Sequence, residues 1–353
     1  MRVILTVDPY LPVPPVHDGG IERMVDLVAR GLAARRHDVS LVAHPASHIP
    51  GAVIPYGAGE HRSRAERAVE LWQLSRALWT RRDAVDVVHS FGRLAGLLPI
   101  LPVRRVAKVQ SWSRDLIPWP SVAIAATLGG ESIRFTACGT HMYAGKAGAR
   151  HGRWSTIGNA VELNRLAFVP VVPDDAPLVF LGRIEPMKGV HHAIAVARAV
   201  GRRLVIAGTR DHVGGAGDYF EREIAPHIDG SRVTYVGPVD DRAKAELLGG
   251  AAALLMLIDV EEAFGLVMIE AMACGSPVIA FRRGAVPEVV RDGVTGIICA
   301  TVGEAIAAVP RVVALDRAAC RADVAARFAS DIIVGHYEQL YEATCADAHR
   351  SGR

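Results

Sequence analysis

The sequence predicts an α/β fold with two doubly wound parallel sheets, and three observations lead to this prediction. The chain has 353 residues, half of them hydrophobic, which exceeds the roughly 250 to 300 residues that one hydrophobic core supports. Short runs rich in β-branched residues alternate with segments of helix length, the pattern of parallel strands joined by helices. A stretch rich in proline and aspartate, residues 170–177, separates two such series and predicts a linker.

The elements of the first series follow from short apolar runs and amphipathic segments between them. Strands are expected at residues 3–7, 39–43, 85–89, 107–110 and 135–138, and helices at 21–35, 62–82 and 141–150. In the second series, strands are expected at residues 178–181, 204–207, 233–236, 253–257 and 278–280, and helices at 190–200, 219–224, 241–249 and 265–273. A last helix is expected at about 331–346, where two tyrosines offer aromatic contacts.

These elements give a first domain over residues 1–165 and a second over residues 166–335. Residues 336–353 then form a C-terminal helix that is free to cross back to the first domain. Two doubly wound sheets in one chain are expected to leave a cleft between them. Ligands of such sheets bind beyond the carboxyl ends of the strands, so the residues that directly follow strands are the first candidates for a site.

Composition excludes several classes of protein. The high apolar content excludes disorder for most of the chain, because enough surface can be buried to offset the entropy of ordering. The longest apolar stretches, 94–103 and 251–258, are shorter than the roughly 20 residues of a spanning helix, and residues 3–7 are too short for a secretory signal. We therefore expect a cytoplasmic protein. Its five cysteines form no C-x-x-C pair and are expected to be reduced thiols.

A formal net charge of +3 hides a difference between the two halves. Residues 1–170 carry 21 Lys and Arg against 13 Asp and Glu, whereas residues 171–353 carry 19 against 24. The basic half either attracts phosphorylated ligands or an anionic membrane, or is a scattered solvated exterior. The segment 62–82 has two interpretations as well. It forms either a helix at a membrane interface or a helix packed on the core of the domain, and we favour the second. Nucleic acid binding is not expected, because no recognition motif accompanies the charge.

Two pairs of residues near helix starts suit a phosphate. Gly19 and Gly20 let backbone N–H groups approach an anion, although a tight turn also explains them, and the absence of a G-x-G-x-x-G spacing argues against NAD or FAD. Arg183 and Lys188 lie on a strand-to-helix turn, where a guanidinium fork and a point charge suit a diphosphate. Because the chain has 36 arginines and only 4 lysines, a lysine at this turn indicates specific chemistry. The alternative is an ordinary solvated helix start.

Two glutamates flank the start of the helix expected at residues 265–273. Glu262 precedes it and Glu270 follows eight positions later, about two turns along, so both are expected to reach one ligand at different depths. An unpaired carboxylate in an apolar helix is costly, and a hydroxylated ligand would satisfy Glu270. The alternative is a helix-capping Glu262 with Glu270 paired to an arginine.

Together these motifs resemble the retaining glycosyltransferases of family 4, which have the GT-B fold of two Rossmann-like domains facing each other across a cleft. The resemblance covers most of the chain and is strongest from residue 178 to about residue 298. It is carried by Gly19-Gly20 with Glu22, Asp86-Val87-Val88-His89, Gly158-Asn159-Ala160-Val161, Gly182-Arg183-Ile184 with Lys188-Gly189, Ala207-Gly208, Val236-Gly237, the Glu262 to Glu270 motif, and the run from Ala271 to Val278.

The resemblance implies a donor site for a nucleotide-diphosphate (NDP) sugar. Arg183, Lys188 and Glu262 would be its catalytic residues, with the two cations neutralising the diphosphate as the glycosidic bond breaks and Glu262 holding the sugar. Glu270 would accept hydrogen bonds from the ribose. The donor site would also contain Gly19, Gly20, Gly182, Gly237, Pro238, Phe264, Gly265 and Leu266. No metal ion or other cofactor is expected, because the chain has no D-x-D triplet and the cations supply the charge.

The acceptor, a small molecule or a lipid, is expected in the first domain. Its candidate contacts are His89, Ser111, Trp112 and Asn159; for His89 the alternative is a strand-end histidine satisfied by the backbone. Many relatives have a Thr-x-His triplet where this chain has Ser111-Trp112-Ser113, so the histidine expected to position the two substrates is missing. Peripheral contact with the inner face of a membrane stays open. The competing interpretations are a nucleotide-sugar-binding protein without activity, and an epimerase or phosphorylase of the same fold.

Overall fold

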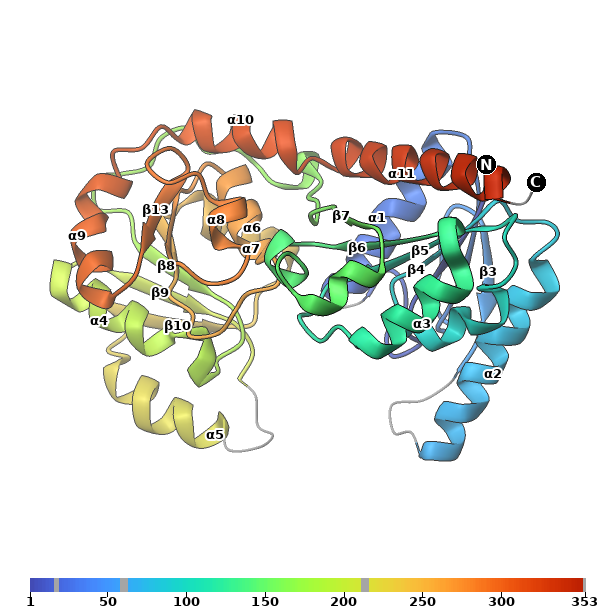
Figure 1. Cartoon of the computed structure of the whole chain (residues 1–353). Helices are drawn as coiled ribbons and strands as arrows, with labels where there is room; N and C mark the ends of the chain where they lie inside the picture. Colours follow the sequence, from blue (N-terminus) through green and yellow to red (C-terminus); the bar gives the residue numbers. More distant parts are fainter. Residues whose placement is uncertain (16–18, 58–62, 211–215, 352–353) are drawn as a thin grey trace. The chain divides into compact units, whose positions relative to one another are not determined.

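The computed structural model describes residues 1–15, 19–57, 63–210 and 216–351 and divides the chain into two compact units. Unit 1 comprises Met1–Ala160 and Ser330–Arg353, and unit 2 comprises Val161–Ala329. Each unit is built on one parallel sheet, in agreement with the fold class that the sequence predicts (Figure 1). The chain passes between the units a few residues earlier than the expected boundaries at 165/166 and 335/336.

The sheet of unit 1 has seven strands in the order β3-β2-β1-β4-β5-β6-β7, and all neighbours are parallel. Its strands are β1 (Arg2–Thr6), β2 (Asp38–Ala43), β3 (Ala52–Pro55), β4 (Val87–Ser90), β5 (Ala107–Trp112), β6 (Ile133–Ala137) and β7 (Trp154–Thr156). Its α-helices are α1 (Gly20–Ala34), α2 (Arg64–Arg81), α3 (Trp119–Gly129) and α11 (Ser330–Ser351). The chain reverses its direction across the sheet between β1 and β4, which makes this the switch point of the sheet.

The sheet of unit 2 has six parallel strands in the order β10-β9-β8-β11-β12-β13. Its strands are β8 (Leu178–Leu181), β9 (Leu204–Ala207), β10 (Val233–Gly237), β11 (Ala253–Met256), β12 (Val278–Phe281) and β13 (Gly296–Cys299). Its α-helices are α4 (Val190–Val200), α5 (Ala216–Tyr219), α6 (Asp241–Gly249), α7 (Leu266–Ala273), α8 (Val286–Val289), α9 (Val302–Val312) and α10 (Arg317–Arg327). Its switch point lies between β8 and β11.

Alternation along the strands decides which helices cover which face. In β1, Val3 and Leu5 point to the same side and are fully buried against α1, whose apolar stripe includes Val28 and Leu32. The same core contains Tyr337 and Tyr341 of α11, so the C-terminal helix covers this face of the unit 1 sheet beside α1 (Figure 1). In unit 2, α4 and α9 pack together on one face of the sheet.

Several elements differ from the sequence prediction. The helix expected at 141–150 is replaced by two short 3-10 helices, Thr140–Met142 and Ala147–His151, because Gly145 between them takes a φ of 75°. The helix expected at 219–224 is the end of α5 followed by a π-helix, Phe220–Ile224. Arg62, the expected first residue of α2, lies outside the described residues. The prediction missed α3, whose apolar residues run around the whole helix without the usual stripe. It also did not place β3, β7, β13, α8, α9 or α10.

Within the described ranges, no helix combines the length and the hydrophobicity that crossing a membrane requires. The expected cytoplasmic location stays a prediction.

Candidate functional site

Unit 2 contains a cavity of about 220 Å³ at the carboxyl ends of β8 and β11. This is the switch point of its sheet, where parallel α/β proteins bind ligands. Three of the residues predicted from the sequence, Arg183, Lys188 and Glu262, line the cavity. Gly182, Gly265 and Leu266 line it as well. The structure therefore brings together the cations after β8 and the loop after β11, as the order of motifs suggested.

The charges of this cavity are partly paired within the protein. The Nζ of Lys188 donates a hydrogen bond of 3.0 Å to Oε2 of Glu262, and both side chains are largely buried. The guanidinium of Arg183 forms an ion pair with Glu185 but remains more than half exposed. An exposed guanidinium can turn toward a ligand at little cost, whereas the Lys188–Glu262 pair is held in place by its surroundings.

The backbone of Glu262 is fixed by the loop after β12. Ala285 N–H donates to the carbonyl oxygen of Glu262 over 2.9 Å, and Gly284 N–H donates to the carboxylate of Glu261. Gly284 has a φ of 51°, and a Cβ at this position would lie 2.1 Å from the carbonyl oxygen of Glu262. Only glycine permits this close approach, so the loop after β12 positions the glutamate that is predicted to hold the sugar.

A second glycine sets the position of Lys188. Gly189 takes a left-handed φ of 73° at the start of α4, and a Cβ there would lie 1.8 Å from the carbonyl oxygen of Leu257. The turn that carries Lys188 therefore packs directly on the end of β11. Asp259 N–H donates to the Met187 carbonyl over 3.0 Å, which ties the same two segments together.

The start of α7 offers backbone donors to the cavity. Gly265 precedes the helix with a φ of 82° and provides no side-chain cap, so the first N–H groups of α7 are left for a ligand. Leu266 and Val267, which carry two of them, line the cavity. The side chain of Phe264 does not: it is buried and packs edge-on against Phe328, with ring centroids 5.6 Å apart. Its expected role can thus involve only its backbone.

Glu270 has a partner inside the protein. Its Oε1 accepts a hydrogen bond of 2.5 Å from Nζ of Lys244 on α6, and each side chain is 17% exposed. Burial lowers the pKa of Lys244, but the attraction of Glu270 and of Asp241 together outweighs it, and the pKa is raised overall. The sequence alternative of a paired Glu270 is therefore the one observed, with a lysine in place of the expected arginine. Glu270 is not among the residues that line the cavity.

Gly237 and Pro238, predicted to flank the base, lie at the end of β10 and outside the cavity lining. Gly237 accepts a hydrogen bond of 2.9 Å from Gly208 N–H, next to the end of β9. A Cβ on Gly208 would lie 1.8 Å from the carbonyl oxygen of Gly182. The segment after β9 is therefore closely packed on the segment after β8, where Gly182 lines the cavity.

Unit 1 has a larger cavity, of about 520 Å³, at its own switch point. Val7 and Asp8 follow β1, and Phe91, Gly92 and Arg93 follow β4. Two predicted acceptor residues, Ser111 and Trp112, line it from the end of β5. The sequence motifs did not indicate Asp8, Arg93 or the apolar lining as ligand contacts, although the rule that ligands bind after strand ends applies to all of them.

His89 does not contact this cavity, which corrects the prediction. The side chain is fully buried in β4: Nδ1 lies 2.5 Å from the Tyr341 hydroxyl of α11, and Nε2 lies 2.6 Å from Oγ of Ser111. Burial lowers the pKa of His89 to about 3, so the ring is neutral. The alternative of a backbone-satisfied histidine is wrong as well, because its partners are side chains from two other elements.

The remaining predicted residues of unit 1 lie near the cavity or away from it. Gly19 and Gly20 begin α1, directly before Ile21 and Glu22, which line the cavity. Asn159 is half-buried and does not line it. The two residues before Gly19, at positions 17 and 18, lie outside the described residues.

One group of side chains in the described ranges has the composition of a metal site. The ligand atoms of His191, His192 and Asp259 all lie within 4.8 Å of one another. Nε2 of His192 lies 3.1 Å from Oδ2 of Asp259, and Nδ1 of His191 lies 2.7 Å from the Tyr219 hydroxyl. These hydrogen bonds account for the cluster without an ion, and independence of metals stays a prediction.

Comparison with known proteins agrees with this geometry. Residues 167–317 match the family of glycosyl transferases group 1. A D-inositol 3-phosphate glycosyltransferase of Mycobacterium marinum is 36% identical over 126 residues, which cover 35% of this chain and 27% of that protein. The match thus spans less than a third of the curated relative's length.

Solved structures match almost the whole chain. Sucrose-phosphate synthase from Thermosynechococcus elongatus superimposes with a TM-score of 0.77 at 21% identity, covering 98% of this chain and 100% of that one. Anabaena HepE, solved in complex with UDP and glucose, gives a TM-score of 0.69 at 19% identity over 97% and 99% of the two chains. Residues 167–317 are thus similar to glycosyl transferases group 1, in a chain that has the GT-B fold of solved glycosyltransferases.

Proposed function

We propose that the chain is a retaining glycosyltransferase that moves a sugar from an NDP-sugar to a small-molecule or lipid acceptor without a metal ion. The observation that carries this proposal is the unit 2 cavity, where Arg183, Lys188 and Glu262 meet at the switch point of the sheet. We assign the donor to this cavity and the acceptor to the cavity of unit 1.

The unit 2 cavity has the charges that departure of a diphosphate needs. When the bond between the anomeric carbon and the diphosphate oxygen breaks, negative charge grows on that oxygen. Lys188 and the exposed guanidinium of Arg183 stabilise it, together with the first N–H groups of α7. Glu262 accepts hydrogen bonds from the hydroxyls of the sugar and keeps the lysine oriented.

We propose that the acceptor attacks the face from which the diphosphate leaves. A new bond forms between the acceptor oxygen and the anomeric carbon, the bond to the diphosphate breaks, and the acceptor proton passes to the departing oxygen. The anomeric configuration is retained and no side-chain nucleophile takes part. Glu270 would accept the ribose hydroxyls while it keeps Lys244, since its carboxylate has lone pairs beyond the one that the lysine uses.

A donor screen tests the proposal. Thermal shift with UDP-, GDP-, ADP- and TDP-sugars identifies the nucleotide, because a ligand that binds only the folded state raises the melting temperature. UDP-glucose is the first to try, since HepE was solved with UDP and glucose. Slow release of NDP from the matched donor, with retained configuration of the sugar in the transfer product, is the expected result.

A nucleotide-sugar-binding protein without activity is the second candidate. It is favoured by His89, whose two nitrogens are both occupied inside the core, so that this histidine cannot serve an acceptor. Tight binding of the donor with no release of NDP, with or without acceptors, would support it and overturn the enzyme.

A further inference from the structure

We infer that the cavity of unit 1 takes an uncharged alcohol or phenol with an apolar body, and not a phosphorylated polyol. The inference rests on the proposed function in that the ligand is assigned as the acceptor of the transferred sugar. Three features of the cavity wall carry it: where the apolar side chains lie, how the charges are paired, and how deep each group is buried.

Three large aliphatic side chains of the cavity wall are exposed to water. Leu98 at 45%, Leu116 at 84% and Ile124 at 55% exposure come from three separate segments and meet around one cavity. Exposure of large aliphatic side chains to water is unfavourable. Three of them around one cavity therefore suit an apolar ligand that covers them. Phe91 and Trp112 add aromatic surface to the same wall.

Two of the three carboxylates at this cavity are buried. Glu22 lines the cavity and is 8% exposed, while Glu70, which pairs with Arg93 of the lining, is 3% exposed. Asp8, also in the lining, is half-buried. The carboxylate of Glu22 is thus buried, whereas three large aliphatic side chains of the same lining are exposed, together with Arg114. A ligand that matches this order enters with a hydroxyl first and leaves its apolar body at the mouth.

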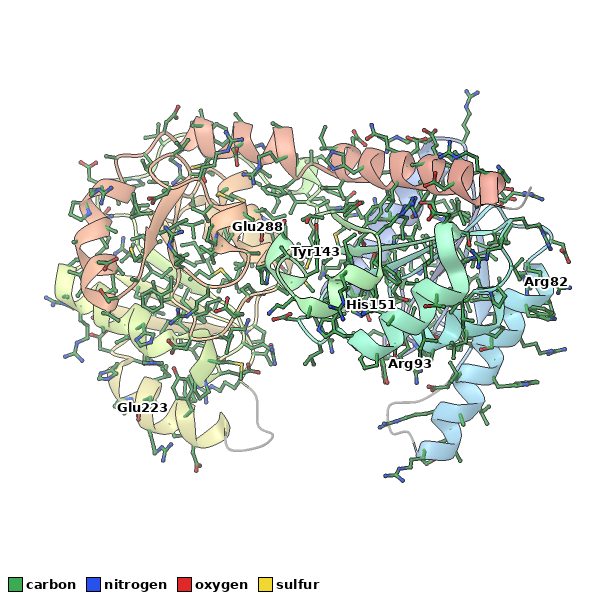
Figure 2. The ribbon with its side chains drawn as sticks, viewed as in Figure 1. Arg82, Arg93, Tyr143, His151, Glu223 and Glu288 are labelled. Atoms are coloured by element: carbon green, nitrogen blue, oxygen red, sulfur yellow. The ribbon has the colours of Figure 1, made fainter. Side chains whose placement is uncertain are left out.

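The cations of the wall are poorly suited to phosphate. Arg93, labelled in Figure 2, donates from Nε to Asp8 over 3.1 Å and from Nη2 to Glu70 over 3.1 Å, so two carboxylates already occupy its guanidinium. A phosphate could use only the N–H groups that these bonds leave, on a guanidinium whose charge two carboxylates already neutralise, and would also face Glu22. Arg114 is the further cation of the lining, and it is exposed to solvent. A dianionic headgroup would therefore meet more negative than accessible positive charge.

Glu22 is the group best placed to receive the hydroxyl of such a ligand. Burial raises the pKa of its carboxyl, against the opposing effects of its own backbone N–H and of Arg114, while Asp8 adds to the rise. A carboxylate in this setting gains from a neutral hydroxyl donor and loses from a second anion. We assign Glu22 as a positioning residue for the acceptor.

Direct binding to the full chain tests the inference. Trp112 lines the cavity, so its fluorescence reports occupancy. Linear alcohols from butanol to octanol, 2-naphthol, myo-inositol and inositol 1-phosphate are titrated without donor. The expected result is saturable binding of the alcohols that tightens about threefold to fourfold per methylene, and weak or absent binding of both inositols. Tighter binding of inositol phosphate, or no dependence on chain length, overturns the inference.

Matched variants on α3 locate the site. Ile124→Ser is expected to weaken octanol binding about tenfold. Leu128→Ser removes another exposed aliphatic side chain of the same helix, 40% exposed against 55% for Ile124, which does not line the cavity; it is expected to change binding less than twofold. Equal effects of the two substitutions would place the alcohol elsewhere on the surface and overturn the inference.

A further experiment asks whether the apolar alcohol is free in solution or part of a membrane. Glucose transfer is measured to 2-naphthol in solution and to a long-chain alcohol carried in phosphatidylcholine vesicles; the faster reaction identifies a free or a membrane-borne acceptor. The proposed function can fail separately. Alcohol binding without NDP release from any donor would overturn the proposed glycosyltransferase activity and leave the ligand of the unit 1 cavity standing. NDP release without alcohol binding would overturn the proposed ligand and leave the activity standing.

Discussion

The Nζ of Lys188 lies 3.0 Å from Oε2 of Glu262, although 74 residues separate the two along the chain. The pair joins the turn after β8 to the loop after β11, the two strands at the switch point of unit 2. A diphosphate that binds here meets a lysine whose position is already set by a neighbouring carboxylate, so little side-chain entropy remains to be lost on binding.

Removing the ammonium of Lys188 should lower kcat by about 10² to 10³ while leaving the fold intact, because one charge that stabilises the leaving group is lost. Lys188→Ala and Glu262→Gln are measured by release of NDP from the matched donor. Lys146→Ala, which removes an exposed lysine of unit 1, is the control and should keep the wild-type rate. Turnover like that of the wild type in both site variants would contradict the assignment.

Gly284→Ala should weaken donor binding although residue 284 is not in the cavity lining. Its Cβ would lie 2.1 Å from the carbonyl oxygen of Glu262, so the loop that carries this glutamate must move. Gly293→Ala is the matched control: its φ of 75° is similarly left-handed, but no atom lies within 4 Å of the new Cβ. Both substitutions should cost about 1 to 2 kcal/mol of unfolding free energy for the left-handed backbone, with an added cost at Gly284. Titration with the donor should show weaker binding by Gly284→Ala than by Gly293→Ala. Equal donor affinities of the two variants would refute the role of Gly284 in positioning Glu262.

The Lys244–Glu270 pair allows the ribose role of Glu270 to be separated from its structural one. Glu270→Gln removes the charge that would hold the ribose, whereas Lys244→Met keeps the carboxylate and removes its partner. Donor affinity should fall about tenfold in Glu270→Gln only, since a hydrogen bond to a charged group is worth roughly 1.5 to 3 kcal/mol. An equal loss in both variants would mean that the pair only maintains the packing of α6 on α7.

The buried His89 should make unit 1 sensitive to acid. Its pKa of about 3 lies below the ordinary 6.5, so between these values the unfolded state binds more protons and stability falls as the pH falls. The slope reaches about 1.4 kcal/mol per pH unit. His89→Phe should be less stable than the wild type at pH 7, and this deficit should shrink by about 2 kcal/mol at pH 5. Chemical denaturation of both proteins at the two pH values measures it; a deficit that does not change with pH would disprove the assignment.

Chelation of divalent cations should leave NDP release unchanged, because the cations at the unit 2 cavity are side chains. The rate is compared with EDTA and with added Mg²⁺ or Zn²⁺. Loss of activity in EDTA, restored by metal and abolished by His192→Ala, would instead make the cluster of His191, His192 and Asp259 a functional metal site.

The features that the sequence predicts best depend on local order along the chain. Strand-to-helix turns place Arg183, Lys188 and Glu262 after β8 and β11, and parallel sheets bring such strand ends together whatever the rest of the chain does. The order of the motifs along the chain is therefore enough to assign these three residues to one cavity.

Features that depend on distant partners could not be predicted in this way. The core position of His89 depends on Tyr341, 252 residues away, and the pairing of Glu270 depends on Lys244 of another helix. No local pattern carries either contact. The apolar cavity of unit 1 was missed for a related reason: Leu98, Leu116 and Ile124 belong to three segments, each unremarkable by itself.

The Tyr341–His89 hydrogen bond also bears on how the protein is made. Residues 1–160 precede unit 2 along the chain, yet α11, which fills one side of the unit 1 core, is separated from them by all of unit 2. On the ribosome, unit 2 has every residue it needs before α11 emerges, and the first 160 residues must wait with a core face uncovered. Residues 1–160 are thus expected to complete their core after unit 2, although they are synthesised before it.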